Sequence, residues 1–243
     1  MCGRFVSSTP PDQLAAYFSA VPTEAALAPS WNVAPTNDIY GVVEHGGERR
    51  LTVFHWGLVP VWAKDIKIGS KMINARAETL AEKNSFKTAL KKRRCLIPLD
   101  GFYEWKSIPG VKTKQPMFIH RVDGEPLAVA GLWESWKDRS QLDANGEPMV
   151  LHSATIITTS ANETMRPVHD RMPAILSPAT WSQWLDTSND DMVSLGELLV
   201  PAPNTLLTMH PVSTSVNNVR TKGPELIDEV PPIEPPGEQA ALL

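Results

Sequence analysis

The chain has 243 residues, a formal net charge of −4 and only two cysteines, Cys2 and Cys95. Two distant thiols cannot build a disulfide framework or a cysteine-rich metal site, which favours a reducing compartment such as the cytoplasm. No signal peptide is recognisable, and no stretch approaches the roughly 18 apolar residues of a membrane span. We therefore expect a soluble cytoplasmic protein with no cofactor, no metal and no membrane partner.

The charge is unevenly distributed along the sequence. Residues 225–243 hold five acidic and no basic side chains, which leaves 23 basic against 22 acidic residues elsewhere. Between Trp62 and Arg94 there are ten lysines or arginines and three acids. Such a stretch can form a local phosphate-binding face without a high pI. A solvated helix flank is the ordinary alternative, and it is the favoured one for Lys87, Lys91 and Lys92.

The first part of the chain predicts a helix and then a strand hairpin. Thr9, followed by two prolines, is typical of a helix N-cap, and this helix is expected to end near Phe18. Residues 39–44 and 51–56 predict two strands joined by a glycine turn. Two short helices are expected next, near Ala77 and over residues 85–93.

The second part predicts further strands and two helices. Residues 95–105 predict one buried strand that leads into a functional turn, and residues 117–121 and 127–133 predict another hairpin. Residues 137–149 are polar and indicate an exposed loop, whereas the β-branched residues 151–159 predict a strand. The two helices are expected around Trp181 and Trp184 and over residues 190–199.

The pattern of connections indicates the fold class. Hairpins dominate over helical crossovers, which favours an α+β fold with a largely antiparallel, barrel-like mixed β-sheet core surrounded by helices. Residues 1–226 are expected to form one domain, and the proline- and glutamate-rich residues 227–243 predict an acidic disordered tail. Four tryptophans are expected to pack in the core: Trp133, Trp136, Trp181 and Trp184.

Cys2 directly follows the initiator methionine. If Met1 is removed, Cys2 carries a thiol and a free α-amine on adjacent carbons, a 1,2-aminothiol. The amine can condense with an aldehyde to an imine, and the thiol can then close a five-membered thiazolidine ring. The ordinary pKa values of both groups, about 8 and about 8.5, make them usable near neutrality. On position alone, a cysteine without any role is the more ordinary interpretation.

Three polar residues stand in apolar or charged surroundings. Asn74 lies between Ile73 and Ala75, Glu104 lies among aromatic residues, and His169 is followed by an aspartate and an arginine. Each has a structural alternative: a turn former, a strand-edge charge and a packed histidine. Together they supply what imine chemistry on an amine needs, since an amide can orient the amine and the carboxyl and imidazole groups can move protons.

Seven segments, taken in order, resemble the motifs of the SOS response-associated peptidase family. The resemblance runs from Cys2 to about Leu226, nearly the whole chain. The segments are Cys2–Phe5, Trp31–Thr36, Trp56–Pro60, Ile73–Glu78, Gly101–Trp105, Val168–Pro173, and Pro211–Ser213 together with Asn217.

The resemblance implies a protein that loses Met1 and crosslinks to abasic sites in single-stranded DNA. It implies that Cys2 is the nucleophile, Asn74 positions the amine, Glu104 is the acid and base, and His169 assists ring opening and crosslink reversal. It further implies phosphate contacts by two arginines and stacking of a base on a tryptophan. The residues expected at the DNA are Arg4, Arg76, Trp62 and Trp105.

Two other classes of function stay open at this point. An N-terminal-nucleophile thiol peptidase would use the freed amine as the base for its own thiol. A non-covalent single-strand binding module would use the arginines and tryptophans alone, and its binding would be fully reversible by salt. The chain is expected to act as a monomer, because attack on an isolated lesion needs one copy.

Overall fold

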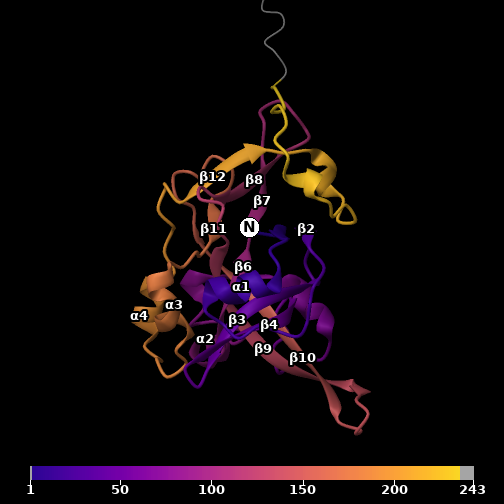
Figure 1. Ribbon diagram of the computed structural model, residues 1–243, viewed down its shortest axis with the longest axis vertical. Helices are drawn as coiled ribbons and strands as arrows, with labels where there is room; N and C mark the ends of the chain where they lie inside the picture. Colours follow the sequence, from indigo (N-terminus) through magenta and orange to yellow (C-terminus); the bar gives the residue numbers. More distant parts are fainter. Residues whose placement is uncertain (1, 236–243) are drawn as a thin grey trace, which may run out of the picture.

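Two β-sheets share most of the chain, and Figure 1 shows them one above the other in this computed structural model, which describes residues 2–235. The lower sheet is a closed ring of five strands in the order β10-β4-β3-β6-β9, with β9 pairing back to β10. The β4–β10 pair is parallel and the other pairs are antiparallel. The expected α+β class and barrel-like mixed sheet are confirmed. The barrel strands are β3 (Asp38–His45), β4 (Glu48–Trp56), β6 (Arg94–Leu99), β9 (Leu127–Leu142) and β10 (Pro148–Ser160).

Two short strands extend the barrel at the far end of β10. They are β5 (Asn74–Arg76), which runs parallel to β10, and β11 (Arg171–Pro173), which runs antiparallel to it. Since β5 follows the Ile73-containing segment and β11 follows His169, this end of β10 brings two of the sequence motifs to one region of the barrel.

The upper sheet has five antiparallel strands in the order β12-β8-β7-β1-β2. The N-terminal strand β1 lies between β2 and β7, so the start of the chain is fixed inside a sheet. The strands are β1 (Phe5–Ser7), β2 (Ser30–Val33), β7 (Gly101–Lys106), β8 (Gln115–Arg121) and β12 (Leu207–Pro211).

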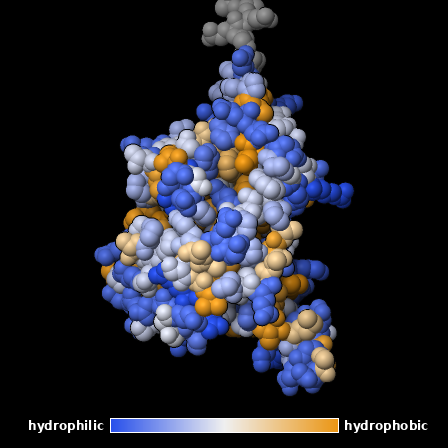
Figure 2. All heavy atoms as spheres, in the orientation of Figure 1, coloured by the Kyte–Doolittle hydropathy of each residue, from blue (hydrophilic) through white to orange (hydrophobic). Residues whose placement is uncertain are grey.

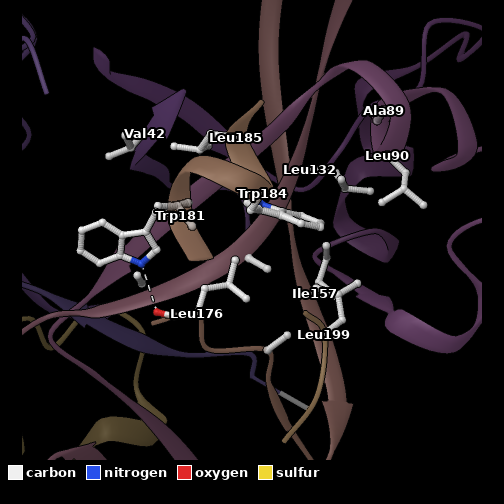
Figure 3. Close-up of a cluster of buried hydrophobic side chains, with 14 of the residues drawn as sticks. Val42, Ala89, Leu90, Leu132, Ile157, Leu176, Trp181, Trp184, Leu185 and Leu199 are labelled. Atoms are coloured by element: carbon white, nitrogen blue, oxygen red, sulfur yellow. Dashed lines mark hydrogen bonds between the residues drawn. The ribbon is translucent and has the colours of Figure 1, made fainter. Parts of the chain in front are cut away.

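Helices cover one side of the barrel, and their apolar faces form the larger core (Figures 1 and 3). Trp181 and Trp184 are buried there, and the indole of Trp181 donates to the Leu176 carbonyl at 3.1 Å (Figure 3). Trp136 is buried and Trp133 packs against the second core cluster, so all four expected core tryptophans do pack. The helices are α1 (Pro11–Phe18), α2 (Lys87–Lys92), α3 (Trp181–Leu185), α4 (Met192–Glu197) and the 3-10 turns η1 (Ile66–Lys71), η2 (Ala77–Thr79), η3 (Pro178–Thr180), η4 (Thr214–Asn217) and η5 (Pro224–Ile227).

The predicted helices are present, but the cap expected for the first one is not. Thr9 does not cap α1; its hydroxyl and its backbone N–H donate to the Asp100 carboxylate instead. The same carboxylate accepts from the Ser8 N–H at 2.6 Å and the Ser8 hydroxyl at 2.8 Å. Asp100 therefore fixes the segment that follows β1, where sequence alone suggested a local helix signal.

Asp100 also marks a correction to the expected strand over residues 95–105. This segment forms two strands in different sheets, β6 in the barrel and β7 in the upper sheet, with Asp100 at the corner between them. The expected hairpin of residues 117–121 with 127–133 is also wrong. β8 pairs with β7 and β12, whereas β9 pairs with β6 and β10, so these consecutive strands belong to different sheets.

The segment expected to be an exposed loop, residues 137–149, is mostly a hairpin. β9 and β10 continue to pair through Leu142 and Pro148 around a turn at residues 143–147. Figure 1 shows this hairpin projecting from the barrel. Its side chains are largely exposed, as their polarity predicted, but exposure does not exclude strand pairing.

The C-terminal segment stays attached beyond the expected domain boundary at residue 226. Glu229 forms an antiparallel bridge with Val212, and the Ile233 N–H donates to Gln115 Oε1 at 2.8 Å. The first residues of the predicted tail are thus part of the packed body, and the remainder of that tail, residues 236–243, lies outside the described residues. Within residues 2–235, no helix is long and apolar enough to cross a membrane.

Candidate active site

Cys2 lies between the two sheets, three residues before the start of β1 at Phe5. Its side chain is fully buried in a cluster that includes Phe5 from the upper sheet and Trp56 and Ile156 from the barrel. The phenyl ring of Phe5 and the indole of Trp56 lie 4.9 Å apart, centroid to centroid. The start of the chain is therefore held where the two sheets meet, which gives the N-terminal residues a defined position.

Asn74 contacts Cys2 directly. Its side-chain Nδ2 donates to the Cys2 carbonyl oxygen at 2.8 Å. Asn74 is the first residue of β5 and pairs with Ile156 of β10. The preceding Ile73 carbonyl accepts from the Trp56 indole at 3.0 Å and from the Ile156 N–H at 3.0 Å, so the amide is held on a rigid barrel edge.

Glu104 approaches Cys2 from the upper sheet. Phe102 of β7 pairs with Phe5 of β1, and the Tyr103 N–H donates to the Arg4 carbonyl at 2.9 Å. Continued by one more residue, this antiparallel register places Glu104 opposite Gly3. The Glu104 side chain is only 4% exposed, so its carboxyl group lies in the interior beside the first residues of the chain.

The pKa of the Cys2 thiol is raised well above its usual range. Burial is the main cause, because it disfavours the thiolate, and the charge of Glu104 is the second. The chain's terminal amine and the Arg4 N–H oppose this shift by favouring the thiolate. Burial thus favours the protonated thiol, and its ionisation is coupled to Glu104 and to positive charge at the N-terminus.

His169 lies beside the same core cluster, since the adjacent Val168 packs against it. Two groups approach His169 Nδ1: the Arg171 N–H at 3.0 Å and the Asp170 carboxylate at 2.8 Å. Nδ1 can serve only one of them at a time. The neutral tautomer with its proton on Nε2 accepts from the Arg171 backbone N–H, whereas any form with a proton on Nδ1 would donate to Asp170. The tautomer that accepts from Arg171 therefore leaves Nε2–H as the donor of this ring.

An ion pair connects the motif of Asn74 with the motif of His169. The Arg171 guanidinium donates from Nη1 and Nη2 to the two oxygens of Glu78, and Nη2 also donates to the Thr158 carbonyl at 2.6 Å. Arg171 is 13% exposed and Glu78 is 52% exposed. The hydrogen bonds from Arg171 lower the pKa of Glu78. This bidentate pair fixes β11 to the turn that follows β5.

Arg4 is held by the protein itself. Its Nη1 donates to Asn32 Oδ1 at 2.8 Å and to the Val216 carbonyl at 2.9 Å, and its guanidinium lies 5.9 Å from the centroid of the Trp105 ring. Partial burial lowers the pKa of Arg4. The Trp105 indole donates to Asn217 Oδ1 at 2.7 Å. Arg4 and Trp105 therefore form one pre-ordered stacked pair.

Arg76 and Trp62 are exposed. Arg76 lies two residues beyond Asn74 on β5, so both side chains project from the same side of this strand, about 7 Å apart. Trp62 is 55% exposed and lies on the connection between β4 and β5. The structure thus brings Cys2, Asn74 and Glu104 together, places Arg76 next to them, and leaves Trp62 outside this contact group.

The SOS response associated peptidase (SRAP) family model matches residues 1–219. The chain belongs to this family. It is 44% identical over 231 residues to the abasic site processing protein YoqW of Bacillus subtilis, covering 94% of this chain and 99% of YoqW. It is 33% identical to YedK of Escherichia coli, with 95% and 100% coverage, and 37% identical to HMCES of Gallus gallus, with 74% of this chain and 57% of HMCES covered.

Solved structures share the SRAP fold seen here. A protein of Bacteroides thetaiotaomicron matches with a TM-score of 0.79 at 24% identity, covering 94% of this chain and 100% of that chain. A phage-related protein of Bordetella bronchiseptica matches with a TM-score of 0.64 at 28% identity, covering 87% and 94%. The barrel with its upper sheet is therefore the architecture of several related chains.

Sequence reasoning missed residues that position the SRAP site. Asn32 is fully buried, and its Nδ2 donates to three carbonyls, those of Val216, Asn218 and Thr221, while its Oδ1 holds Arg4. A polar residue between Trp31 and Val33 was the available signal, because such residues need partners when buried. Sequence spacing did not predict that Asp100 lies at the corner between β6 and β7. It did not predict the ion pair of Glu78 with Arg171 either.

Proposed function

We propose that this protein captures abasic sites in single-stranded DNA by a covalent thiazolidine crosslink to Cys2, formed after Met1 is removed. The single observation that carries the proposal is the Asn74 Nδ2 hydrogen bond to the Cys2 carbonyl beside the buried Glu104 carboxyl group. An amide and a carboxyl group at the first mature residue are what aldehyde capture by a terminal amine requires. The names of YoqW, YedK and HMCES as abasic site processing proteins support the same activity.

The reaction balances without a cofactor. The Cys2 amine adds to the open-chain sugar aldehyde, and one water leaves to give an imine. The sulfur then bonds to the imine carbon, and the thiol proton passes to nitrogen, which closes the ring. Asn74 orients the residue, and Glu104 moves the proton from sulfur toward nitrogen. Within residues 2–235, no cluster of three or more His, Cys, Asp or Glu side chains could hold a metal.

The buried thiol fits this order of steps. A protonated iminium beside sulfur carries positive charge, which favours the thiolate and opposes the shift caused by burial and Glu104. Attack by sulfur on the iminium carbon therefore follows imine formation. His169, at the edge of the cluster, is assigned to ring opening and crosslink reversal.

The DNA contacts follow from exposure and charge. Arg76 is exposed on the same side of β5 as Asn74 and can bind a phosphate next to the lesion. Arg4 and Trp105 offer a fixed cation and an aromatic face, and Trp62 offers an exposed one. We further propose that the protein works as a monomer in the cytoplasm, on nucleoid DNA.

The test compares three single strands of equal sequence: intact, with one abasic site, and with a tetrahydrofuran analogue that lacks the aldehyde. Protein confirmed to start at Cys2 should give a denaturation-resistant product with the abasic strand alone. Adducts with none of the strands would refute the proposal. Turnover of peptides or amides in place of adduct formation would instead support an N-terminal-nucleophile thiol peptidase, including self-removal of Met1.

A further inference from the structure

Two glycines cross each other in the connection between β4 and β5. Gly57 directly follows β4, and Gly69 is buried within η1, although most residues of η1 are exposed. A Cβ atom on Gly69 would lie 2.5 Å from the Gly57 carbonyl oxygen, and one on Gly57 would lie 2.6 Å from the Gly69 carbonyl oxygen. Ordinary contacts of a Cβ atom begin at 3.4 Å. The two backbones therefore touch directly, and neither position has room for a side chain.

The two positions need glycine for different reasons. Gly57 has a φ of +134°, a conformation that side chains disfavour, in addition to its contact with Gly69. The φ of Gly69 lies outside that region, so the close approach of Gly57 alone excludes a side chain there. Gly69→Ala therefore tests the contact without adding backbone strain of this kind.

The barrel holds the Gly57 side of the crossing. The Gly57 N–H donates to the Ala154 carbonyl of β10 at 2.8 Å, and the Val59 N–H donates to the Ser153 hydroxyl at 2.8 Å. The exposed η1 is the less firmly held partner, so a methyl group on Gly69 displaces η1 rather than the barrel. The contact must lengthen from 2.5 Å to the 3.4 Å of an ordinary one, a movement of about 1 Å.

The Gly69 side of the crossing leads to Asn74 within five residues. The Met72 N–H donates to the Gly69 carbonyl at 2.8 Å, and the Leu58 N–H donates to the Met72 carbonyl at 3.2 Å. Two residues later, Asn74 Nδ2 donates to the Cys2 carbonyl at 2.8 Å. A displacement of Gly69 therefore acts on the segment that places this amide.

We propose that Gly69 is a positioning residue for Asn74, because its close contact with Gly57 sets the place of the amide that holds Cys2. The proposal rests on the crosslinking function proposed above and gives a part in it to a residue outside the seven motifs. A reacting group that is misplaced by about 1 Å can lose about 100-fold in rate. The missing side chain at position 69 thus serves the capture of the aldehyde as well as the fold.

The first measurement is the single-turnover rate of crosslinking at a saturating concentration of abasic strand. Gly69→Ala should slow it by about 10- to 100-fold. The double variant Gly69→Ala/Asn74→Ala should be no slower than Asn74→Ala, because two changes that act through one contact do not add. A parent-like rate for Gly69→Ala, or effects that multiply in the double variant, would overturn the proposal.

Two controls separate the position of the amide from the stability of the fold. Gly41→Ala crowds the barrel, since an added Cβ atom would lie 2.6 Å from Cε2 of Phe54, and it lies outside the β4–β5 connection. Gly146→Ala lies in the turn of the β9–β10 hairpin, which projects from the body in Figure 2, and has open space at its Cβ position. Both should crosslink at the parent rate when equal concentrations of folded protein, fixed by urea denaturation, are compared.

The second measurement needs no DNA and follows the Asn74 side-chain amide by NMR in protein that begins at Cys2. The resonance is assigned by its loss in Asn74→Ala. Gly69→Ala should shift it and speed its hydrogen exchange with water, and the two controls should leave it unchanged. If Gly69→Ala does not fold, Val59→Ala replaces it, because this change removes a methyl group 3.1 Å from the Cβ position of Gly69 and should also speed the exchange.

The two measurements fail in different ways. An Asn74 resonance that is the same in the parent and in the variants of the crossing would overturn the positioning role. Absence of any adduct from the parent protein, together with a shifted resonance in Gly69→Ala, would overturn the proposed function and leave the positioning of the amide supported.

Discussion

A thiol with a raised pKa is a poor nucleophile at neutral pH, yet Cys2 is buried beside a carboxyl group that raises its pKa further. Burial also removes the thiol from solvent. In the mechanism that we propose, the iminium formed from the Cys2 amine would hold a positive charge beside sulfur and favour the thiolate. The proposal therefore predicts that ring closure follows capture of an aldehyde.

Replacing Cys2 by alanine tests the division of labour between amine and thiol. The amine remains and can still form an imine, but no ring can close, and the imine acidifies the adjacent sugar carbon and promotes β-elimination. We expect Cys2→Ala to lose the stable adduct and to cleave the abasic strand slowly. Denaturing gels of end-labelled DNA measure both outcomes. The control is Cys95→Ala, since Cys95 is equally buried but lies within the sequence. A stable adduct with intact DNA for Cys2→Ala would contradict the mechanism.

Replacing Glu104 by glutamine separates the charge of this residue from its proton transfer. Loss of the negative charge should lower the Cys2 pKa, since that charge is the second cause of its elevation. Alkylation of Cys2, followed by peptide mass spectrometry, should then begin at lower pH than in the parent. Crosslinking should nevertheless be slower, by about 100-fold, within the usual range for loss of an acid–base group. A variant that is faster in both reactions would assign Glu104 a purely electrostatic role.

At the scale of elements, one buried arginine joins the helices to the barrel. Arg94 is 1% exposed at the start of β6, and burial lowers its pKa. Its guanidinium donates to five carbonyl oxygens at the ends of α2 and α3 and in the turn beyond, and these helix ends have no further intrahelical donors. The carbonyls belong to Leu90, Lys91, Trp184, Asp186 and Asn189.

Arg94→Met should destabilise the fold strongly, because several buried carbonyls lose their donors at about 1–3 kcal/mol each. We expect a loss of at least about 3 kcal/mol in the free energy of unfolding, measured by urea denaturation. Arg94→Lys should recover little of it, since one ammonium cannot replace the planar fork. Lys92→Met, exposed at the end of α2, is the control. A loss below about 1 kcal/mol for Arg94→Met would contradict this account.

The Glu78–Arg171 pair predicts a pH-dependent effect. The folded pKa of Glu78 lies below its ordinary value of 4.5, so the pair stabilises the fold above that pH and stops doing so as the pH falls. Because Glu78 is half exposed, Glu78→Gln should cost at most about 1 kcal/mol near neutral pH. Urea denaturation at neutral and acidic pH measures the difference, which should vanish in acid. An equal cost at both pH values would contradict the ion-pair account.

At the scale of the whole molecule, local sequence patterns predicted the helices and strands better than they predicted which strands pair with each other. The strands over residues 39–44, 51–56 and 151–159 and the helix ending at Phe18 were readable, because alternation, turns and prolines act within a few residues. The wrong hairpin of residues 117–133 shows the limit. No local sequence feature of β8 or β9 indicates that they belong to different sheets. Each of them pairs with strands that lie elsewhere in the sequence.

The candidate site shows the same contrast between features that the sequence predicts and features that depend on the fold. The family motifs supplied the residues that we propose for the chemistry, and the hydrogen bond from Asn74 to Cys2 fits the positioning role proposed for this amide. The residues that position the site were not predictable. Asn32 and Asp100 form hydrogen bonds to segments that only the folded structure brings next to them. The long β9–β10 hairpin was hidden for a related reason: its exposed polar residues resemble a loop, whereas its pairing depends on register with the opposite strand.

The most direct test of the central claim is the intact mass of the product formed by this protein and a single-stranded oligonucleotide with one abasic site. The account predicts the summed mass of both, less Met1 and one water, unchanged by borohydride because a thiazolidine has no imine to reduce. A product that gains hydrogen on reduction would show an imine without ring closure. No product from protein that begins at Cys2 would contradict the account entirely.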